Sequence, residues 1–379
     1  MEIRPRLQAV RQAMAGEPVD ALYLRPGANL AYLTGVRRQQ PHATDTNAYA
    51  DWIEGAYVGL ERLVLVVPRM GSEFFLHQAR GKPWISDVRV VLEGEDPASV
   101  MGDVLHRVAP GARRVAVDDR AWVPTVEALR AAGLQLVPAS RLIAPLRMIK
   151  TADELEVMRR AAAVADAVYM AILKVLREGV RELDVAHEID YQFAQHGADY
   201  PAFVTGVRFT RPNSDRLPTT RHGQRRLAPG DAITFDFGCV YEEYCSDFGR
   251  TAFLGSPPQE VAAMFDAVLE AQRAAMAAMR AGDITAEDAD RTARDVLREA
   301  GYGDYFTHRL GHGIGVTVHE PPYLETGDRT VLREAMTFTV EPSSRVPNGY
   351  ACRVEDVVVV TPDSAVPLTQ APRALAVIE

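Results

Sequence analysis

The segment DFGCVYEEYCSDFGR, residues 236–250, contains the tripeptide Asp-Phe-Gly twice, so that two aspartates lie eleven residues apart. Apolar and aromatic residues on both sides of a short polar centre predict the two strands of a β-hairpin. A carboxylate weakens an apolar strand, because burying an ionised group costs free energy. Asp236 and Asp247 therefore need partners that compensate for their burial.

A second pair of acids lies on another predicted hairpin. Glu341 follows TFTV and Glu355 precedes DVVVV, so both acids also interrupt runs of β-forming residues. Two helices are predicted before each hairpin, and the order helix, helix, hairpin therefore occurs twice. The first helix begins after Thr151, which forms a predicted capping box with Glu154. The other three span about residues 183–196, 258–280 and 286–300.

Four carboxylates on two hairpins would repel one another strongly if all were ionised and buried. Their pKa values rise until they are neutral, or cations bind them. Salt bridges to Arg250 or Arg353 are the alternative to a metal ion. Such a pair explains a single buried acid, whereas four acids on two hairpins favour metal.

His312 lies in the glycine-rich segment GHGIG, residues 311–315. Glycines allow close backbone approach and leave space beside the imidazole, which favours a ligand over a structural histidine. One imidazole and four carboxylates suit a hard divalent ion such as Mn²⁺, with Co²⁺ or Zn²⁺ also able to bind. Four negative charges balance two divalent ions, and a hydroxide between two ions is a nucleophile at neutral pH.

The bulk properties set limits on the function. A length of 379 residues predicts two domains, and a net charge of −9 predicts no nucleic-acid partner. No apolar run is long enough to predict a membrane span. Three cysteines are too few for a disulfide scaffold, which predicts a cytoplasmic protein. Residues 1 to about 140 alternate strand and helix patterns, with EFFLHQA (73–79) among the predicted strands, and predict an α/β domain.

Several motifs together resemble the pita-bread metallopeptidases, which include prolidase, aminopeptidase P, methionine aminopeptidase and the related creatinase. The motifs that carry the resemblance are PLRMIKTADELEVMRRAA, LAPGDAITFDFG, YCSDFGRT, HRLGHGIGVTVHEPP, VEP and RVED. Their order and spacing are most similar to those of the Xaa-Pro peptidases. The resemblance implies a creatinase-like N-terminal domain, residues 1–143. It also implies an α+β pita-bread catalytic domain with a pseudo-two-fold repeat, residues 144–379.

The resemblance also implies roles for individual residues. The metal ligands would be Asp236, Asp247, His312, Glu341 and Glu355. Asp247 and Glu355 would bridge both ions, and Glu341 would also transfer a proton during catalysis. His319 would contact the substrate near the scissile bond. The N-terminal domain would form a homodimer.

The substrate side departs from the family pattern. A histidine expected in a Pro-His pair is Thr219, and His222 is the candidate that could replace it. Ser343 stands where the family usually has glycine. His319, His222, Arg221 and Arg353 are therefore the predicted substrate contacts.

Arginines are concentrated just before the first ligand strand, where the family places substrate contacts. They are Arg208, Arg211, Arg216, Arg221, Arg225 and Arg226. Because a guanidinium binds a carboxylate through two hydrogen bonds, the cluster favours recognition of a free C-terminal carboxylate.

We therefore predict a two-metal exopeptidase that hydrolyses dipeptides or short peptides, similar to an Xaa-Pro dipeptidase. The alternative is a metallocarboxypeptidase on the same scaffold. Another amide hydrolase and a non-enzymatic relative are disfavoured by the complete ligand set.

Overall fold

The computed structural model describes residues 2–38, 48–213 and 223–379. These residues form two compact units, Met1–Arg147 and Met148–Glu379. The predicted boundary between residues 143 and 144 falls within helix α6 (Ser140–Met148) and stays a prediction.

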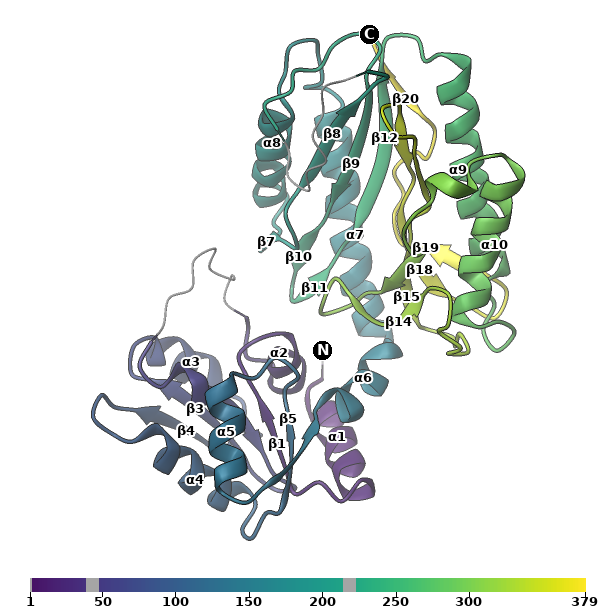
Figure 1. Cartoon of the computed structure of the whole chain (residues 1–379). Coiled ribbons are helices and arrows are strands. Elements are labelled where there is room, and N and C mark those ends of the chain that lie inside the picture. The colour runs from purple at the N-terminus through teal and green to yellow at the C-terminus, as the bar shows by residue number, and fades with distance from the viewer. Residues whose placement is uncertain (1, 39–47, 214–222) are drawn as a thin grey trace. The chain divides into compact units, whose positions relative to one another are not determined.

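The N-terminal unit is built on a six-stranded mixed sheet with the order β4-β3-β2-β1-β5-β6 (Figure 1). Its strands are β1 (Ala21–Leu24), β2 (Gly55–Val58), β3 (Leu63–Pro68), β4 (Asp87–Val91), β5 (Arg114–Val117) and β6 (Gln135–Pro138). Its other helices are α1 (Arg4–Gly16), α2 (Ala28–Thr34), η1 (Asp51–Ile53), α3 (Ser72–Ala79), α4 (Pro97–Val108) and α5 (Val123–Ala131). The buried face of α4 packs in the same apolar core as the central strands. The predicted α/β architecture is present.

One predicted strand of this unit is wrong. Residues 73–79 form most of helix α3, of which only Ser72 and Phe75 are buried. Strands β3 and β4 pair in parallel, and parallel neighbours need a crossover that returns the chain to the same end of the sheet. The segment 73–79 lies in that crossover, so the topology places a helix where local apolar content indicates a strand.

The C-terminal unit contains a four-stranded sheet, β20-β12-β9-β8, and a five-stranded sheet, β14-β13-β15-β18-β19. The strands of the first sheet are β8 (Gly206–Thr210), β9 (Ala232–Phe237), β12 (Phe248–Leu254) and β20 (Ala376–Ile378). Those of the second are β13 (Gly311–Gly313), β14 (Glu320–Leu324), β15 (Thr337–Val340), β18 (Asp356–Val360) and β19 (Ala365–Pro367). The remaining strands are β7 (Tyr200–Pro201), β10 (Cys239–Tyr241), β11 (Tyr244–Cys245), β16 (Ser343–Arg345) and β17 (Ala351–Arg353).

Each of these two sheets packs against its own pair of helices (Figure 1). The first pair is α7 (Ala152–Ile172) and α8 (Glu182–Gln195), and the second is α9 (Gln259–Ala278) and α10 (Ala286–Glu299). A short 3-10 helix, η2 (Gly303–Tyr305), follows the second pair. The predicted repeat of helix, helix and hairpin is therefore present as two helix-backed sheets with separate apolar cores.

Local signals in the sequence set the helix boundaries. Helix α7 begins with the predicted capping box: the Thr151 hydroxyl accepts from the Glu154 backbone N–H, and the Glu154 carboxylate accepts from the Thr151 N–H. These two bonds satisfy donors that a helix leaves unpaired at its first turn. None of the helices in the described parts of the chain is long and apolar enough to cross a membrane.

Candidate metal centre

The two Asp-Phe-Gly tripeptides lie on neighbouring antiparallel strands. In the β9–β12 register Asp236 lies opposite Gly249, and Phe237 lies opposite Phe248. The two phenylalanine rings stack in the apolar core with their centroids 5.1 Å apart. Because side chains alternate across a strand, the aspartates project from the opposite face, and both point to the same side of the sheet. The repeat therefore places apolar rings in the core and carboxylates in the site.

The second hairpin brings its two glutamates together in the same way. Val340 of β15 pairs with Asp356 of β18, so Glu341 and Glu355 follow at the next opposing positions. The Glu355 N–H donates to the Gly249 carbonyl oxygen at 2.9 Å, which joins this hairpin to the first one. A Cβ atom at Gly249 would lie 2.6 Å from Glu355 Oε2. Glycine at this position thus leaves the space that the Glu355 carboxylate fills.

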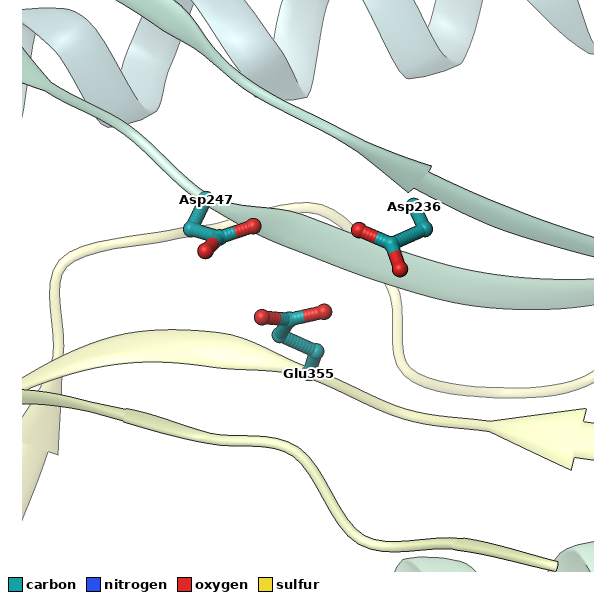
Figure 2. Close-up of side chains that lie close together, drawn as sticks. All are labelled: Asp236, Asp247 and Glu355. Carbon is teal, nitrogen blue, oxygen red and sulfur yellow. The ribbon is translucent and has the colours of Figure 1, made fainter. Parts of the chain in front are cut away.

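Three carboxylates converge between the hairpins (Figure 2). Asp236, Asp247 and Glu355 each offer an oxygen within 4.8 Å of the others. The His312 Nε2 atom lies 3.6 Å from Asp247 Oδ2 and 3.3 Å from Glu341 Oε1. The structure therefore brings together all five residues that the sequence indicated as ligands.

The imidazole of His312 is fixed by its surroundings. Its Nδ1 atom lies 3.1 Å from the Gly313 carbonyl oxygen, and since that oxygen can only accept, Nδ1 carries the proton. The lone pair of Nε2 then faces Asp247 and Glu341, as in metal-binding histidines whose other nitrogen is held by a backbone carbonyl. A Cβ atom at Gly311 would lie 1.9 Å from the Thr339 carbonyl oxygen. Glycine is therefore required for β13 to pack this closely against β15.

Arg353 lies among the acids. Its guanidinium binds the carboxylate of Asp236, and it lies 3.1 Å from Glu341 Oε2 and 3.3 Å from Glu355 Oε2. The salt bridges considered as an alternative to metal thus exist for Arg353, whereas Arg250 binds Asp356 at 2.8 Å instead. One guanidinium cannot balance four ionised carboxylates, so the remaining charge must be compensated by protons or by a cation.

The pKa values within the cluster are strongly displaced. Burial raises the pKa of Asp247 to about 8, with nearby Asp236 and Glu341 acting in the same direction against His312. Burial and the charge of Asp247 also raise the pKa of Glu355 well above its ordinary range. Burial acts to raise the pKa of Glu341 as well, but His312 and Arg353 outweigh it and lower that pKa to about 2. The site thus contains carboxyl groups that, without a bound cation, hold protons near neutral pH.

These residues fit divalent metal ions. The Asp247 Oδ1 atom is buried and has no hydrogen-bond partner among the described residues, which leaves a coordination position open. The donors are carboxylate oxygens and one imidazole nitrogen, a set that suits hard or borderline divalent ions. A cation here would compensate for the burial of both Asp247 and Glu355.

Two further histidines border the cluster. The ring of His319 lies with its centroid 4.1 Å from that of His312, and partial desolvation together with the charge of His312 lowers the pKa of His319. His308, which the sequence analysis missed, binds Ser343 Oγ through Nε2 at 2.6 Å and the Arg309 carbonyl oxygen through Nδ1 at 2.7 Å. The position of His308 in HRLGHG, four residues before His312, is the signal that could have identified it.

The predicted substrate side is only partly described. Thr219, Arg221, His222 and Arg216 lie outside the described residues. Arg211 and Arg225 bind Asp231, and Arg226 donates to the Gly179 carbonyl oxygen at 2.7 Å. Arg208 lines a pocket of about 110 Å³ beside Asp236.

We call this cavity the arginine pocket. It is bounded by apolar, hydroxyl and guanidinium side chains. The described lining residues are Phe203, Val204, Gly206, Arg208, Thr234, Phe235, Asp236, Ser343, Ser344, Arg345, Ala351, Cys352 and Arg353.

The geometry of two acid-bearing hairpins around a histidine is that of a metallopeptidase, and the chain belongs to metallopeptidase family M24, whose pattern matches residues 156–362. Residues 6–149 match the creatinase/prolidase N-terminal domain. The predicted pita-bread fold with its creatinase-like domain is therefore confirmed, as is the prediction of a metal-dependent peptidase that uses divalent ions.

Relatives cover the whole chain or its larger part. The putative dipeptidase YkvY of Bacillus subtilis is 32% identical over 377 residues, which are 98% of this chain and 99% of the relative. The Xaa-Pro dipeptidase of Pyrococcus furiosus is 39% identical over 234 residues, 62% of this chain and 66% of the relative. Among solved structures, a prolidase from Thermococcus sibiricus has a TM-score of 0.88 at 29% identity, covering 100% of this chain and 99% of that one.

Proposed function

We propose that this chain is a dipeptidase with a two-ion metal centre, and that Mn²⁺ is the ion it binds best. The observation that carries the proposal is the convergence of Asp236, Asp247 and Glu355 within 4.8 Å, next to His312 and Glu341. Two divalent cations balance four carboxylates. Similarity to proteins named dipeptidase and Xaa-Pro dipeptidase supports the substrate class.

The reaction is hydrolysis: the peptide C–N bond breaks, a hydroxyl group adds to the carbonyl carbon, and a proton passes to the departing amine. Bound metal supplies Lewis acidity and lowers the pKa of water. We assign the proton transfer to Glu341, whose carboxylate is ionised, accepts a hydrogen bond from the Thr339 hydroxyl and lies 3.3 Å from His312 Nε2. His319, with its lowered pKa, is neutral near pH 7 and can donate a hydrogen bond to the substrate.

We assign to Arg353 the orientation of the site as well as contact with the substrate. Its guanidinium binds Asp236 and approaches Glu341 and Glu355, so it fixes three carboxylates that come from both hairpins. Because planar guanidinium groups hold carboxylates in a defined geometry, Arg353 keeps these oxygens at fixed separations. His222 and Arg221 remain predicted substrate contacts.

We infer that the enzyme recognises a free C-terminal carboxylate on its substrate, because arginines line the pocket beside Asp236. The metallocarboxypeptidase alternative is not favoured, since the relatives are named dipeptidases and Xaa-Pro dipeptidases. A dipeptidase needs both a free amine and a free carboxylate on its substrate. Hydrolysis of an N-acetylated dipeptide as fast as the free dipeptide would support the carboxypeptidase instead.

The proposal also covers the cellular compartment and the oligomeric state of the protein. We propose a cytoplasmic homodimer that forms through the N-terminal unit. Cys239, Cys245 and Cys352 are buried free thiols, the state that a reducing compartment preserves. Light scattering at micromolar concentration tests the dimer, and a monomer would contradict it.

The experiment that tests the function combines metal content with activity. Protein reconstituted with Mn²⁺ and desalted is expected to retain two ions per chain by mass spectrometry of the metals. It should hydrolyse Xaa-Pro and other dipeptides and lose that activity with a chelator. Less than one ion per chain, together with activity that the chelator leaves unchanged, would contradict the proposal.

A further inference from the structure

The loop 314–319 between strands β13 and β14 carries His319 at its end and is followed directly by Glu320. The backbone ladder alone does not fix this end of the loop. The register of the two strands shifts just before Gly313. The two residues after Glu320 are prolines, which have no N–H to donate. Side-chain contacts are therefore needed to fix the chain where His319 lies.

Glu320 forms a buried ion pair with Lys150. The Lys150 Nζ atom lies 2.8 Å from Glu320 Oε1, and only 2% and 4% of the two side chains are exposed. The Thr317 hydroxyl lies 3.3 Å from the other carboxylate oxygen, Oε2, and 3.2 Å from the His319 carbonyl oxygen. The Glu320 carboxylate thus connects the loop to a cation that is 170 positions away in the chain.

Lys150 is itself held by the backbone on both sides. Its N–H donates to the Ala335 carbonyl oxygen at 2.9 Å, just before strand β15. The next residue is Thr151, whose N–H donates to the Glu154 carboxylate at 2.8 Å in the capping box of α7. Because the backbone of Lys150 is anchored in this way, its ammonium group is a fixed point for the loop.

The space around the ion pair fits a lysine and a glycine. A Cβ atom at Gly315 would lie 2.5 Å from Glu320 Oε1 and 3.1 Å from Lys150 Cε. Only three of the 42 Lys and Arg residues of this chain are lysines, and a buried pair such as Arg250 with Asp356 uses arginine. A compact ammonium group on an unbranched stem suits the confined space beside Gly315 better than a planar guanidinium.

The other end of the loop is held by the first acid-bearing hairpin. The Cys245 N–H donates to the Gly315 carbonyl oxygen at 2.8 Å. The loop is thus fixed by this bond at its beginning and by the ion pair at its end. Between its anchors the loop presents His319, whose ring centroid lies 4.1 Å from that of His312. The position of His319 beside the metal centre therefore depends on both anchors.

We propose that Lys150 and Glu320 are positioning residues, whose ion pair holds His319 in place for contact with the substrate. The inference rests on the proposed dipeptidase function and on the role assigned there to His319. A buried ion pair contributes little net stability compared with apolar residues of the same size, because taking both charges out of water costs free energy. The contribution of this pair is therefore a defined loop conformation.

The test is a double-mutant cycle on kcat/KM for an Xaa-Pro dipeptide. His319→Ala and Lys150→Met should each lower kcat/KM about 10- to 100-fold, the value of one hydrogen bond to the transition state, with metal content retained. Because Lys150 acts through His319, adding Lys150→Met to His319→Ala should cost at most about twofold more. Effects that multiply would overturn the inference, since a general structural defect lowers activity whether or not His319 is present.

Two further variants carry the test if Lys150→Met does not fold. The double variant Lys150→Met/Glu320→Gln leaves no unpaired buried charge, so it is expected to fold while the ion pair is still lost. Gly315→Ala places a methyl group against the pair from the side of the loop. Both should lower kcat/KM in the wild-type background and have little effect in the His319→Ala background. Wild-type activity in the folded double variant would overturn the inference.

The matched control is Thr285→Ala, which removes the capping hydroxyl of α10 in the same unit. It should lower the urea concentration at the midpoint of unfolding, while kcat/KM stays within about twofold. This control distinguishes a loss of stability from a loss of position.

The outcomes separate the inference from the function on which it rests. Wild-type protein that hydrolyses no dipeptide overturns the proposed function and the inference with it. A dipeptidase that stays fully active as His319→Ala overturns the role of His319 and its positioning. An active wild type in which the effects of Lys150→Met and His319→Ala multiply overturns the positioning role alone and leaves the dipeptidase intact.

Discussion

Glu355 and Asp356 are consecutive residues with equal burial and opposite environments. Both are almost fully buried, with 1% and 0% of their surface exposed. Asp356 binds Arg250 at 2.8 Å and accepts from Gln272 at 3.0 Å, and Arg373 and Thr369 complete its shell. Glu355 instead faces Asp247 and Asp236, with Arg353 as its nearby positive charge.

The pKa values of Glu355 and Asp356 differ because of these environments. Burial acts to raise the pKa of Asp356, but Arg250 and Arg373 outweigh it and the pKa is lowered. Burial and neighbouring carboxylates raise the pKa of Glu355. The protein thus compensates Asp356 with its own groups, while Glu355 must keep a proton or be compensated by a cation from solution. Burial of an acid alone does not distinguish a structural carboxylate from a metal ligand, whereas the partners around it do.

The largest expected effect is on the activity of Glu355→Gln. Removing one charged ligand of the proposed metal centre should lower kcat/KM by at least about 10⁴-fold, because ion binding and transition-state stabilisation would be lost together. Activity and metal content of the purified variant measure this loss. The exposed Glu299→Gln variant on α10 is the matched control and should behave as the wild type. If the Glu355→Gln variant kept normal activity and two bound ions, Glu355 would not differ from Asp356 in its role.

Glu341→Gln separates proton transfer from metal binding. The amide keeps one oxygen for the ion but cannot accept a proton, so kcat should fall about 10²- to 10⁴-fold while metal content is retained. Steady-state kinetics on Xaa-Pro dipeptides and metal analysis of the same sample provide the measurement. A variant with near-normal turnover would show that another residue transfers the proton.

The Asp356→Asn variant tests whether Asp356 is a structural carboxylate. The substitution leaves Arg250 and Arg373 without their carboxylate, and breaking a buried pair on one side costs about 3–5 kcal/mol in the free energy of unfolding. Urea denaturation measures the loss, with the exposed Asp363→Asn variant as control. Unchanged stability would mean that Asp356 contributes no more than a surface acid.

Metal removal is expected to give the smallest effect, a decrease in Tm. This decrease should differ between the Glu355 and Asp356 variants. An ion at 100 times its dissociation constant stabilises the folded state by about 2.7 kcal/mol, so chelation should lower Tm of the wild type by about 5–10 °C. Asp356→Asn should keep this metal-dependent shift, and Glu355→Gln should lose most of it. Thermal unfolding with and without Mn²⁺ measures the shifts; an equal shift in both variants would contradict the comparison.

Local sequence signals were sufficient for several parts of the molecule. The capping box of Thr151 and Glu154, the paired hairpins and the order of helices follow from patterns within about 25 residues. The strand predicted at residues 73–79 failed because the parallel pairing of β3 and β4, decided elsewhere in the chain, required a helix. Where the chain must form a crossover between parallel strands, the topology overrides the local propensity for a strand.

By itself, the sequence determined which residues are the candidates for the chemistry: acids in apolar strands and a histidine between glycines have few alternative explanations. Only the tertiary structure decided how they are used. It directs Glu355 to the site and Asp356 to Arg250, brings Arg353 into the carboxylate cluster, and places Arg208 and Arg345 on facing walls of one pocket. The contacts of Arg353 with Asp236, of Asp356 with Arg250 and of Glu355 with Asp247 join residues more than 100 positions apart, and strand register, which no local pattern specifies across such distances, determines them.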